Sequence, residues 1–133
     1  MAKVQLPSVF PYEEFVLPAV QRHFETLGFR VETNGEEDLT CVHRETGERW
    51  CLEAKGETAS RSTDFQTGLG QLLQRMLDPA QHYALAIPNT PPFRRLCHSI
   101  SPSVRTALRL HWLLVADDGH VQLYLPDQQP DLP

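Results

Sequence analysis

Hydrophobic and polar positions change their spacing several times along the chain, and each spacing predicts a type of secondary structure. Between residues 12 and 27, apolar side chains recur every three or four positions, which is typical of an amphipathic helix. The apolar face consists of Val16, Leu17, Val20, Phe24 and Leu27. Pro11 is well placed to begin this helix and Gly28 to end it, whereas Pro18 predicts a kink or two short helices.

Short apolar runs predict strands, and two further helical patterns separate them. The strands are expected at residues 29–32, 39–43, 50–54, 82–87, 110–116 and 121–125. A second helix is expected at residues 65–77, after the capping residues 62–64. A third helical region at residues 93–108 is interrupted near Ser101 and Pro102. The predicted order is therefore α-β-β-β-α-β-α-β-β.

Residues 38–55 are the stretch that calls for a chemical explanation. They predict two strands joined by a turn at residues 45–48, so that Asp38 folds back beside the end of the second strand. Because side chains alternate along a strand, Cys51, Glu53 and Lys55 share one face, and Trp50, Leu52 and Ala54 share the other. Two carboxylates and a lysine at one end of a sheet suit a hard cation with a base or charge stabiliser beside it.

Asp38, the hairpin and the sequence Glu53-Ala54-Lys55 resemble the core of the PD-(D/E)XK nuclease superfamily. Glu37 stands where the proline of the superfamily name would be. The predicted element order also matches the α-β-β-β-α-β core of these nucleases over residues 12–116. The resemblance implies an α/β fold with a three-layer α/β/α restriction-endonuclease-like core around a central mixed sheet of four to five strands.

The same resemblance implies a metal-dependent chemistry. Asp38, Glu53 and the backbone carbonyl of Ala54 would hold one or two Mg²⁺ or Mn²⁺ ions. Lys55 would orient or help to deprotonate a water molecule and stabilise charge on the scissile phosphate, since lysine is a compact point charge. Gln71 matches the glutamine of the Gln-xxx-Tyr signature of many superfamily members and would position the water or Lys55.

Two residues of this comparison leave alternatives open. Arg75 stands where the signature has tyrosine, and it would either contact a phosphate or lie on a solvated helix face. Glu13 resembles the first-helix glutamate that leans toward the metal in superfamily members, with Glu14 as the alternative if Pro18 rotates the helix. A glutamate in the first turn is equally expected from its favourable interaction with the helix dipole.

Length and composition favour a single cytosolic domain. The chain has 133 residues, of which 41% are hydrophobic, and we expect one domain over residues 1–125 followed by a flexible Pro-rich tail at residues 126–133. No apolar run approaches the roughly 20 residues of a membrane span, and the N-terminal residues lack the apolar core of a signal peptide. The cysteines Cys41, Cys51 and Cys97 are expected to be buried thiols rather than a disulfide. The six scattered histidines indicate no zinc site.

The net charge of −5 argues against binding nucleic acid through bulk electrostatics. A nuclease would therefore need local contacts, for which the candidates are Arg61, Arg75, Arg94 and Arg95. Three interpretations remain: a DNA endonuclease of restriction, repair or junction processing, a binding module on the same fold with weak or absent cleavage, or an unrelated α/β domain. The first implies DNA as partner, with a homodimer or partner subunit choosing the target, and neither a membrane nor an organic cofactor.

Overall fold

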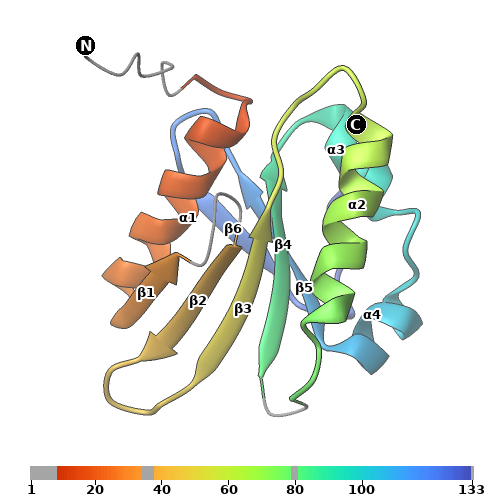
Figure 1. The fold of residues 1–133 in the computed structure, drawn as a ribbon. Coiled ribbons are helices and arrows are strands. Elements are labelled where there is room, and N and C mark those ends of the chain that lie inside the picture. Colours follow the sequence, from red (N-terminus) through yellow and green to blue (C-terminus); the bar gives the residue numbers. More distant parts are fainter. Residues whose placement is uncertain (1–8, 34–37, 79–80, 133) are drawn as a thin grey trace.

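The computed structural model describes residues 9–33, 38–78 and 81–132, and within these ranges six strands and four helices are found (Figure 1). The strands are β1 (Phe29–Thr33), β2 (Asp38–His43), β3 (Arg49–Ala54), β4 (His82–Pro88), β5 (Leu110–Val115) and β6 (Val121–Tyr124). The helices are α1 (Glu13–Thr26), α2 (Arg61–Gln74), α3 (Pro91–Cys97) and α4 (Pro102–Leu108).

All six strands form one mixed sheet in the order of the sequence. Strands β1, β2 and β3 form an antiparallel meander, β3, β4 and β5 run parallel, and β6 returns antiparallel to β5. The predicted order of strands is confirmed, but the sheet has six strands rather than four to five. The prediction of the sheet size was too low because both edge strands, β1 and β6, pair with their sequence neighbours, β2 and β5, and so join the same sheet.

Helices cover both faces of the sheet and so make three layers (Figure 1). The core on one face joins α1 to side chains such as Leu52 and Ala54, and the core on the other joins α2 and α3 to Cys51 and Leu85. The predicted alternation along β3 is therefore confirmed. Strands β4 and β5 are buried along nearly their whole length, because parallel strands are covered by helices on both faces.

Two helices differ from their predicted forms. Helix α1 is one helix through Pro18 rather than two short helices, because the missing amide would bond to the carbonyl of Glu14, an exposed residue in the first turn; the alternative of a kink stays a prediction. Helix α2 begins at Arg61 and ends at Gln74, whereas the sequence predicted residues 65–77. The predicted capping residue Asp64 instead lies inside the first turn, where its carboxylate accepts a hydrogen bond from the Thr58 hydroxyl.

The segment after β6 lies against the molecule, at residues where the sequence predicts a flexible tail. The fully buried guanidinium of Arg105 donates to the carbonyls of Leu110, Tyr124, Leu125 and Gln128, and stacks on the Trp112 ring at 4.6 Å. The side-chain oxygen of Gln129 accepts from Trp112 Nε1 at 3.1 Å. These contacts fix residues 125–129 beside β5.

The three cysteines are buried free thiols, as the composition suggested. Burial raises the pKa of both Cys41 and Cys97 to about 12, so these thiols stay protonated at neutral pH. In the described residues, no helix combines the length and the apolar character that a bilayer span requires.

Candidate active site

Asp38 and Glu53 face each other across the β2–β3 ladder. They are directly opposite in the antiparallel register, so their side chains project from the same face of the sheet. The register follows from the hairpin turn, where the left-handed backbone of Gly47 (φ 75°) lets His43 bond to Glu48. Glu53 is 1% exposed, and the Asp38 side chain is 32% exposed. The hairpin thus brings the two predicted metal ligands together.

Lys55 follows Glu53 by two residues and projects from the same face. Its backbone amide donates to the carbonyl of Ala86 at 2.9 Å, which continues the parallel pairing of β3 with β4. The residue is 8% exposed, and its side chain crosses α2 at Gly68, where an added Cβ would lie 2.9 Å from Lys55 Cγ. The absence of a side chain at Gly68 therefore provides the space that Lys55 occupies.

The two glycines of α2 give a matched pair of substitutions for stability. Gly70→Ala is expected to stabilise the protein by about 0.5–1 kcal/mol, because alanine is the better helix former and nothing described lies within 4 Å of its Cβ. Gly68→Ala gains the same helix propensity but must displace Lys55, so we expect no net gain or a loss. Urea unfolding measures both, and equal stabilisation by the two alanines would show that Lys55 does not rest on Gly68.

Arg75 lies over both carboxylates. Its Nη1 is 3.2 Å from Asp38 Oδ1 and 3.3 Å from Glu53 Oε2, and it also donates to the Leu52 carbonyl at 3.0 Å. Its Nη2 donates to the Leu39 carbonyl at 3.5 Å. The sequence predicted a phosphate contact or an exposed cation at this position, and it gave no signal for these intramolecular ion pairs.

The oxygen donors fit a hard divalent cation. Asp38 Oδ1 and Glu53 Oε2 converge on one atom, Arg75 Nη1, so they already surround a position occupied by positive charge. In the part of the chain that the structure describes, no three His, Cys, Asp or Glu side chains gather as a metal site. The donors are therefore two carboxylates and the predicted carbonyl of Ala54, a set typical of Mg²⁺, which keeps several water molecules or phosphate oxygens as ligands.

Cys51 lies on the same face of β3 and adds no reactive thiolate. Burial raises the pKa of its thiol, and the carboxylates of Asp38 and Glu53 act in the same direction, while Arg75 opposes them. The thiol is therefore neutral at pH 7, so it is neither an activated nucleophile nor a ligand for a hard cation.

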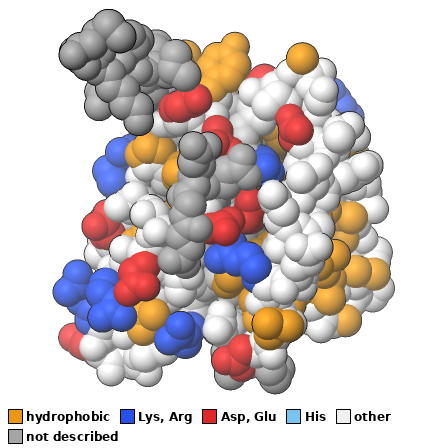
Figure 2. All heavy atoms as spheres, in the orientation of Figure 1, with side chains coloured by type: hydrophobic (Ala, Val, Ile, Leu, Met, Phe, Trp, Pro, Cys, Tyr) orange, Lys and Arg blue, Asp and Glu red, His pale blue; other side chains and the backbone are white. Residues whose placement is uncertain are grey.

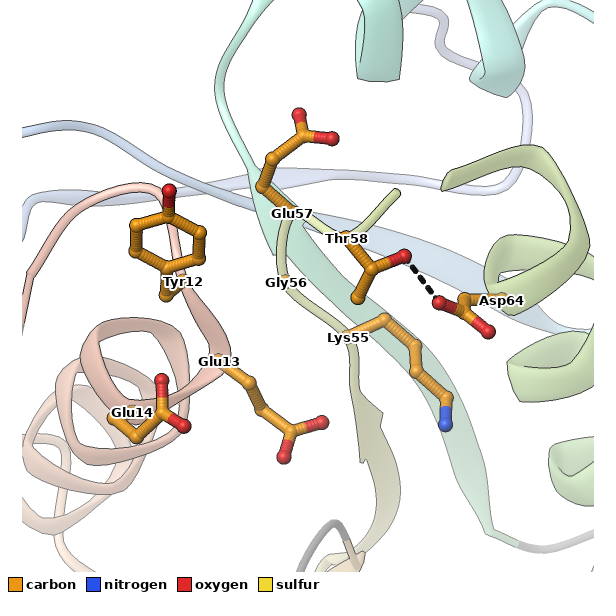
Figure 3. A pocket seen from close by; sticks show the side chains of 8 residues that line it. All are labelled: Tyr12, Glu13, Glu14, Lys55, Gly56, Glu57, Thr58 and Asp64. Atoms are coloured by element: carbon orange, nitrogen blue, oxygen red, sulfur yellow. Dashed lines mark hydrogen bonds between the residues drawn. The ribbon is translucent and has the colours of Figure 1, made fainter. Parts of the chain in front are cut away.

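Glu13 and Lys55 line a cavity of about 270 Å³ between the start of α1 and the end of β3. The chain packs tightly there: a Cβ added at Gly56 would lie 2.1 Å from the amide nitrogen of Glu13. Figure 3 shows the Glu13 carboxylate extending from α1 toward Lys55, while Glu14 projects from another side of the helix. Between these two, Glu13 is the residue that faces Lys55. Its role as a metal ligand stays a prediction.

Gln71 lies on α2 between Gly68 and Arg75. The spacing of three and four residues places it on the same stripe of the helix as both. It is exposed to solvent. Its proposed role, to position a water molecule or Lys55, stays a prediction.

The other candidate arginines lie around the start of α2 and on α3. Arg61 pairs with Glu57 at 2.9 Å, Arg94 donates to the carbonyl of Asp131 at 3.3 Å, and Arg95 is exposed. Figure 2 shows acidic and basic side chains interspersed on the face between α1 and α2 rather than one continuous basic surface. This distribution agrees with the net charge of −5, and nucleic-acid contacts by these arginines stay a prediction.

Comparison with known proteins supports the fold. No protein-family model matches the chain, and no curated protein matches it. Among solved structures, it is similar to an XisH family protein from Nostoc punctiforme PCC 73102, with a TM-score of 0.55 and 15% identity over 81% of this chain and 96% of that one. It is also similar to an fdxN element excision controlling factor protein from Anabaena variabilis, with a TM-score of 0.56 and 14% identity over 83% and 97% of the two chains. XisH family proteins adopt a restriction-endonuclease-like fold, so the likeness agrees with the predicted architecture.

Proposed function

We propose that this protein is a metal-dependent phosphodiester hydrolase that cleaves DNA. The observation that carries the proposal is the convergence of Asp38 Oδ1 and Glu53 Oε2 on one cation position, with Lys55 two residues further along the same face. The fold likeness supports it, and one structural neighbour is an fdxN element excision controlling factor protein, which favours a nucleic-acid substrate.

Each residue has a definite part in this proposal. Asp38, Glu53 and the Ala54 carbonyl would hold Mg²⁺ or Mn²⁺, and the bound ion would supply an activated water and neutralise charge on the phosphate. Lys55 orients the attacking water and stabilises the negative charge that develops on the phosphoryl oxygens. Its burial strengthens this interaction, because a charge shielded from water acts in a lower dielectric. Glu13 extends its carboxylate toward Lys55 from the start of α1 (Figure 3), so its negative charge would act on the same ammonium.

The direct test is Mn²⁺-dependent nicking of supercoiled plasmid by the wild type, Asp38→Asn and Glu53→Gln. Each variant is expected to lose about 100-fold or more in rate, because a bound metal contributes several kcal/mol and about 1.4 kcal/mol corresponds to tenfold. Glu25→Gln, an exposed carboxylate near the end of α1, is the control and should cleave like the wild type. Full activity in either site variant would overturn the proposal.

A second candidate function is a binding module on the same fold. The observation in its favour is Arg75, whose ion pairs compensate the charge of Asp38 and Glu53 without any metal. The acidic net charge favours a protein partner over an extended contact with nucleic acid. If the wild type cleaves neither plasmid nor branched DNA in Mn²⁺, this second function replaces the first.

A further inference from the structure

We propose that Arg75 is an internal counter-cation that closes the Asp38–Glu53 site, and that a phosphodiester backbone opens it by drawing Arg75 away. Divalent metal and nucleic acid would then bind cooperatively. This inference rests on the proposed function, because it concerns regulation of the same carboxylates. It starts from one geometric fact, which is that a single nitrogen, Arg75 Nη1, contacts both of them.

Arg75 and a metal ion compete for the same oxygens. Carboxylate oxygens that hold Mg²⁺ lie about 2.0–2.1 Å from the ion. Asp38 Oδ1 and Glu53 Oε2 lie 3.2 and 3.3 Å from Arg75 Nη1, so the nitrogen fills the space between them. Two cations cannot share that space, because they exclude each other sterically and repel each other electrostatically. Metal binding therefore requires the guanidinium to leave.

The contacts of Arg75 make its departure unfavourable without a replacement partner. The guanidinium also donates to the carbonyls of Leu52 and Leu39, and its side chain is 23% exposed. Leaving the site breaks two ion pairs and two hydrogen bonds in a partly shielded position. We therefore expect Arg75 to lower the metal affinity of the resting protein by about tenfold.

The position of Arg75 lets it move to a phosphate. It is the C-cap residue of α2, so its side chain starts where the helix ends. The exposed part of the guanidinium gives an approaching anion access. Guanidinium groups bind phosphate through paired hydrogen bonds, which would replace those lost to the carboxylates and carbonyls. A backbone phosphate would thus release Asp38 and Glu53 for the metal, and by linkage the metal would strengthen nucleic-acid binding by the same factor.

The test is calorimetric titration of Mn²⁺ into the wild type and Arg75→Gln, with no nucleic acid present. Arg75→Gln is expected to bind Mn²⁺ about tenfold more tightly. Arg44→Gln removes an exposed positive charge at the hairpin turn and should leave the affinity unchanged, which separates a local effect from net charge. Arg75→Lys retains the positive charge but lacks the two terminal nitrogens of the guanidinium, so we expect its Mn²⁺ affinity to rise by about two- to threefold. This variant also provides the answer if Arg75→Gln does not fold by circular dichroism.

The same titration with a short DNA duplex tests the release by phosphate. It is made in a Lys55→Met background, so that the duplex stays intact. We expect the duplex to raise the Mn²⁺ affinity of the protein that has Arg75 by at least about fivefold, within the usual range of coupling between sites. The duplex should leave the affinity of the Arg75→Gln form unchanged. An equal increase in both forms would overturn release by phosphate.

The outcomes separate this inference from the proposed function. Unchanged or weaker Mn²⁺ binding by folded Arg75→Gln would overturn the inference and make Arg75 a structural link between α2 and β3. Tighter binding by Arg75→Gln without any cleavage by the wild type would leave the inference standing and overturn the nuclease. If the wild type cleaves DNA but Arg75→Gln binds Mn²⁺ no more tightly, the proposed nuclease would stand and the inference about Arg75 would be overturned. No Mn²⁺ binding by either protein would overturn both.

Discussion

Lys55→Met is expected to lower the rate of DNA cleavage by about 1000-fold while Mn²⁺ affinity stays within about threefold of the wild type. Removing one preorganised donor from a transition-state charge typically costs a factor of about 100 to 1000, and Lys55, which directly follows β3, is buried on the carboxylate face. The ammonium supplies no oxygen ligand, so metal binding does not depend on it directly. Methionine keeps an apolar stem across Gly68 and preserves the packing against α2.

The measurement pairs single-turnover cleavage with calorimetry on the same preparations. Arg49→Met, which removes an exposed cation at the start of β3, is the matched control and should cleave like the wild type. If Lys55→Met cleaves at the wild-type rate, the catalytic group lies elsewhere. If it loses Mn²⁺ binding together with cleavage, Lys55 positions the carboxylates rather than acting on the phosphate.

The placement of Asp38, Glu53 and Lys55 could be predicted because it depends only on local rules. Side chains in a strand alternate with a period of two, and the turn at residues 44–47 fixes which residues of β2 and β3 face each other. A single slip in register would have put Asp38 on the opposite face from Glu53. The apolar residues Trp50, Leu52 and Ala54 oppose such a slip, because it would remove them from the core beneath α1 and put Glu53 in their place.

The position of Arg75 could not be predicted, because it depends on where α2 ends. The sequence pattern placed that helix at residues 65–77, which makes residue 75 part of a regular helical face. In the structure α2 ends at Gln74, and Arg75 follows as the C-cap, from which it reaches Asp38 and Glu53. Helix ends are the least certain part of any pattern-based prediction, and here a shift of three residues changes the interpretation of the site.

The contacts of the C-terminal segment were also beyond sequence reasoning, for a different reason. Its composition of proline, aspartate and glutamine is typical of flexible chains. This segment is held by Arg105, which lies about 20 positions earlier in the chain. In the sequence, Arg105 looks like one of several surface cations of a basic helical region. Only the tertiary structure shows that Arg105 is fully buried, with backbone carbonyls of this segment as acceptors.

Arg105→Met is expected to lower the free energy of unfolding by about 3–5 kcal/mol, the largest stability effect that we predict for a single substitution. Burial lowers the pKa of Arg105 to about 10, so the guanidinium remains charged at neutral pH and needs all its acceptors. Methionine fills much of the volume beside Trp112 but leaves the carbonyls of Leu125 and Gln128 without their donor. Losing one side of a buried charged network typically costs this amount.

Urea and thermal unfolding measure the effect, for which we expect a fall in Tm of about 10–20 °C in a protein of this size. Arg95→Met, an exposed arginine on α3, is the control and should stay within about 0.5 kcal/mol of the wild type. A second comparison identifies the cause. A chain ending at Pro126 lacks Gln128 and Gln129 but keeps the carbonyls of Leu110, Tyr124 and Leu125, so Arg105→Met should cost less in that chain than in the full one. Equal costs in both chains would show that Arg105 stabilises the protein through the carbonyls of Leu110, Tyr124 and Leu125 and does not hold the residues after Pro126.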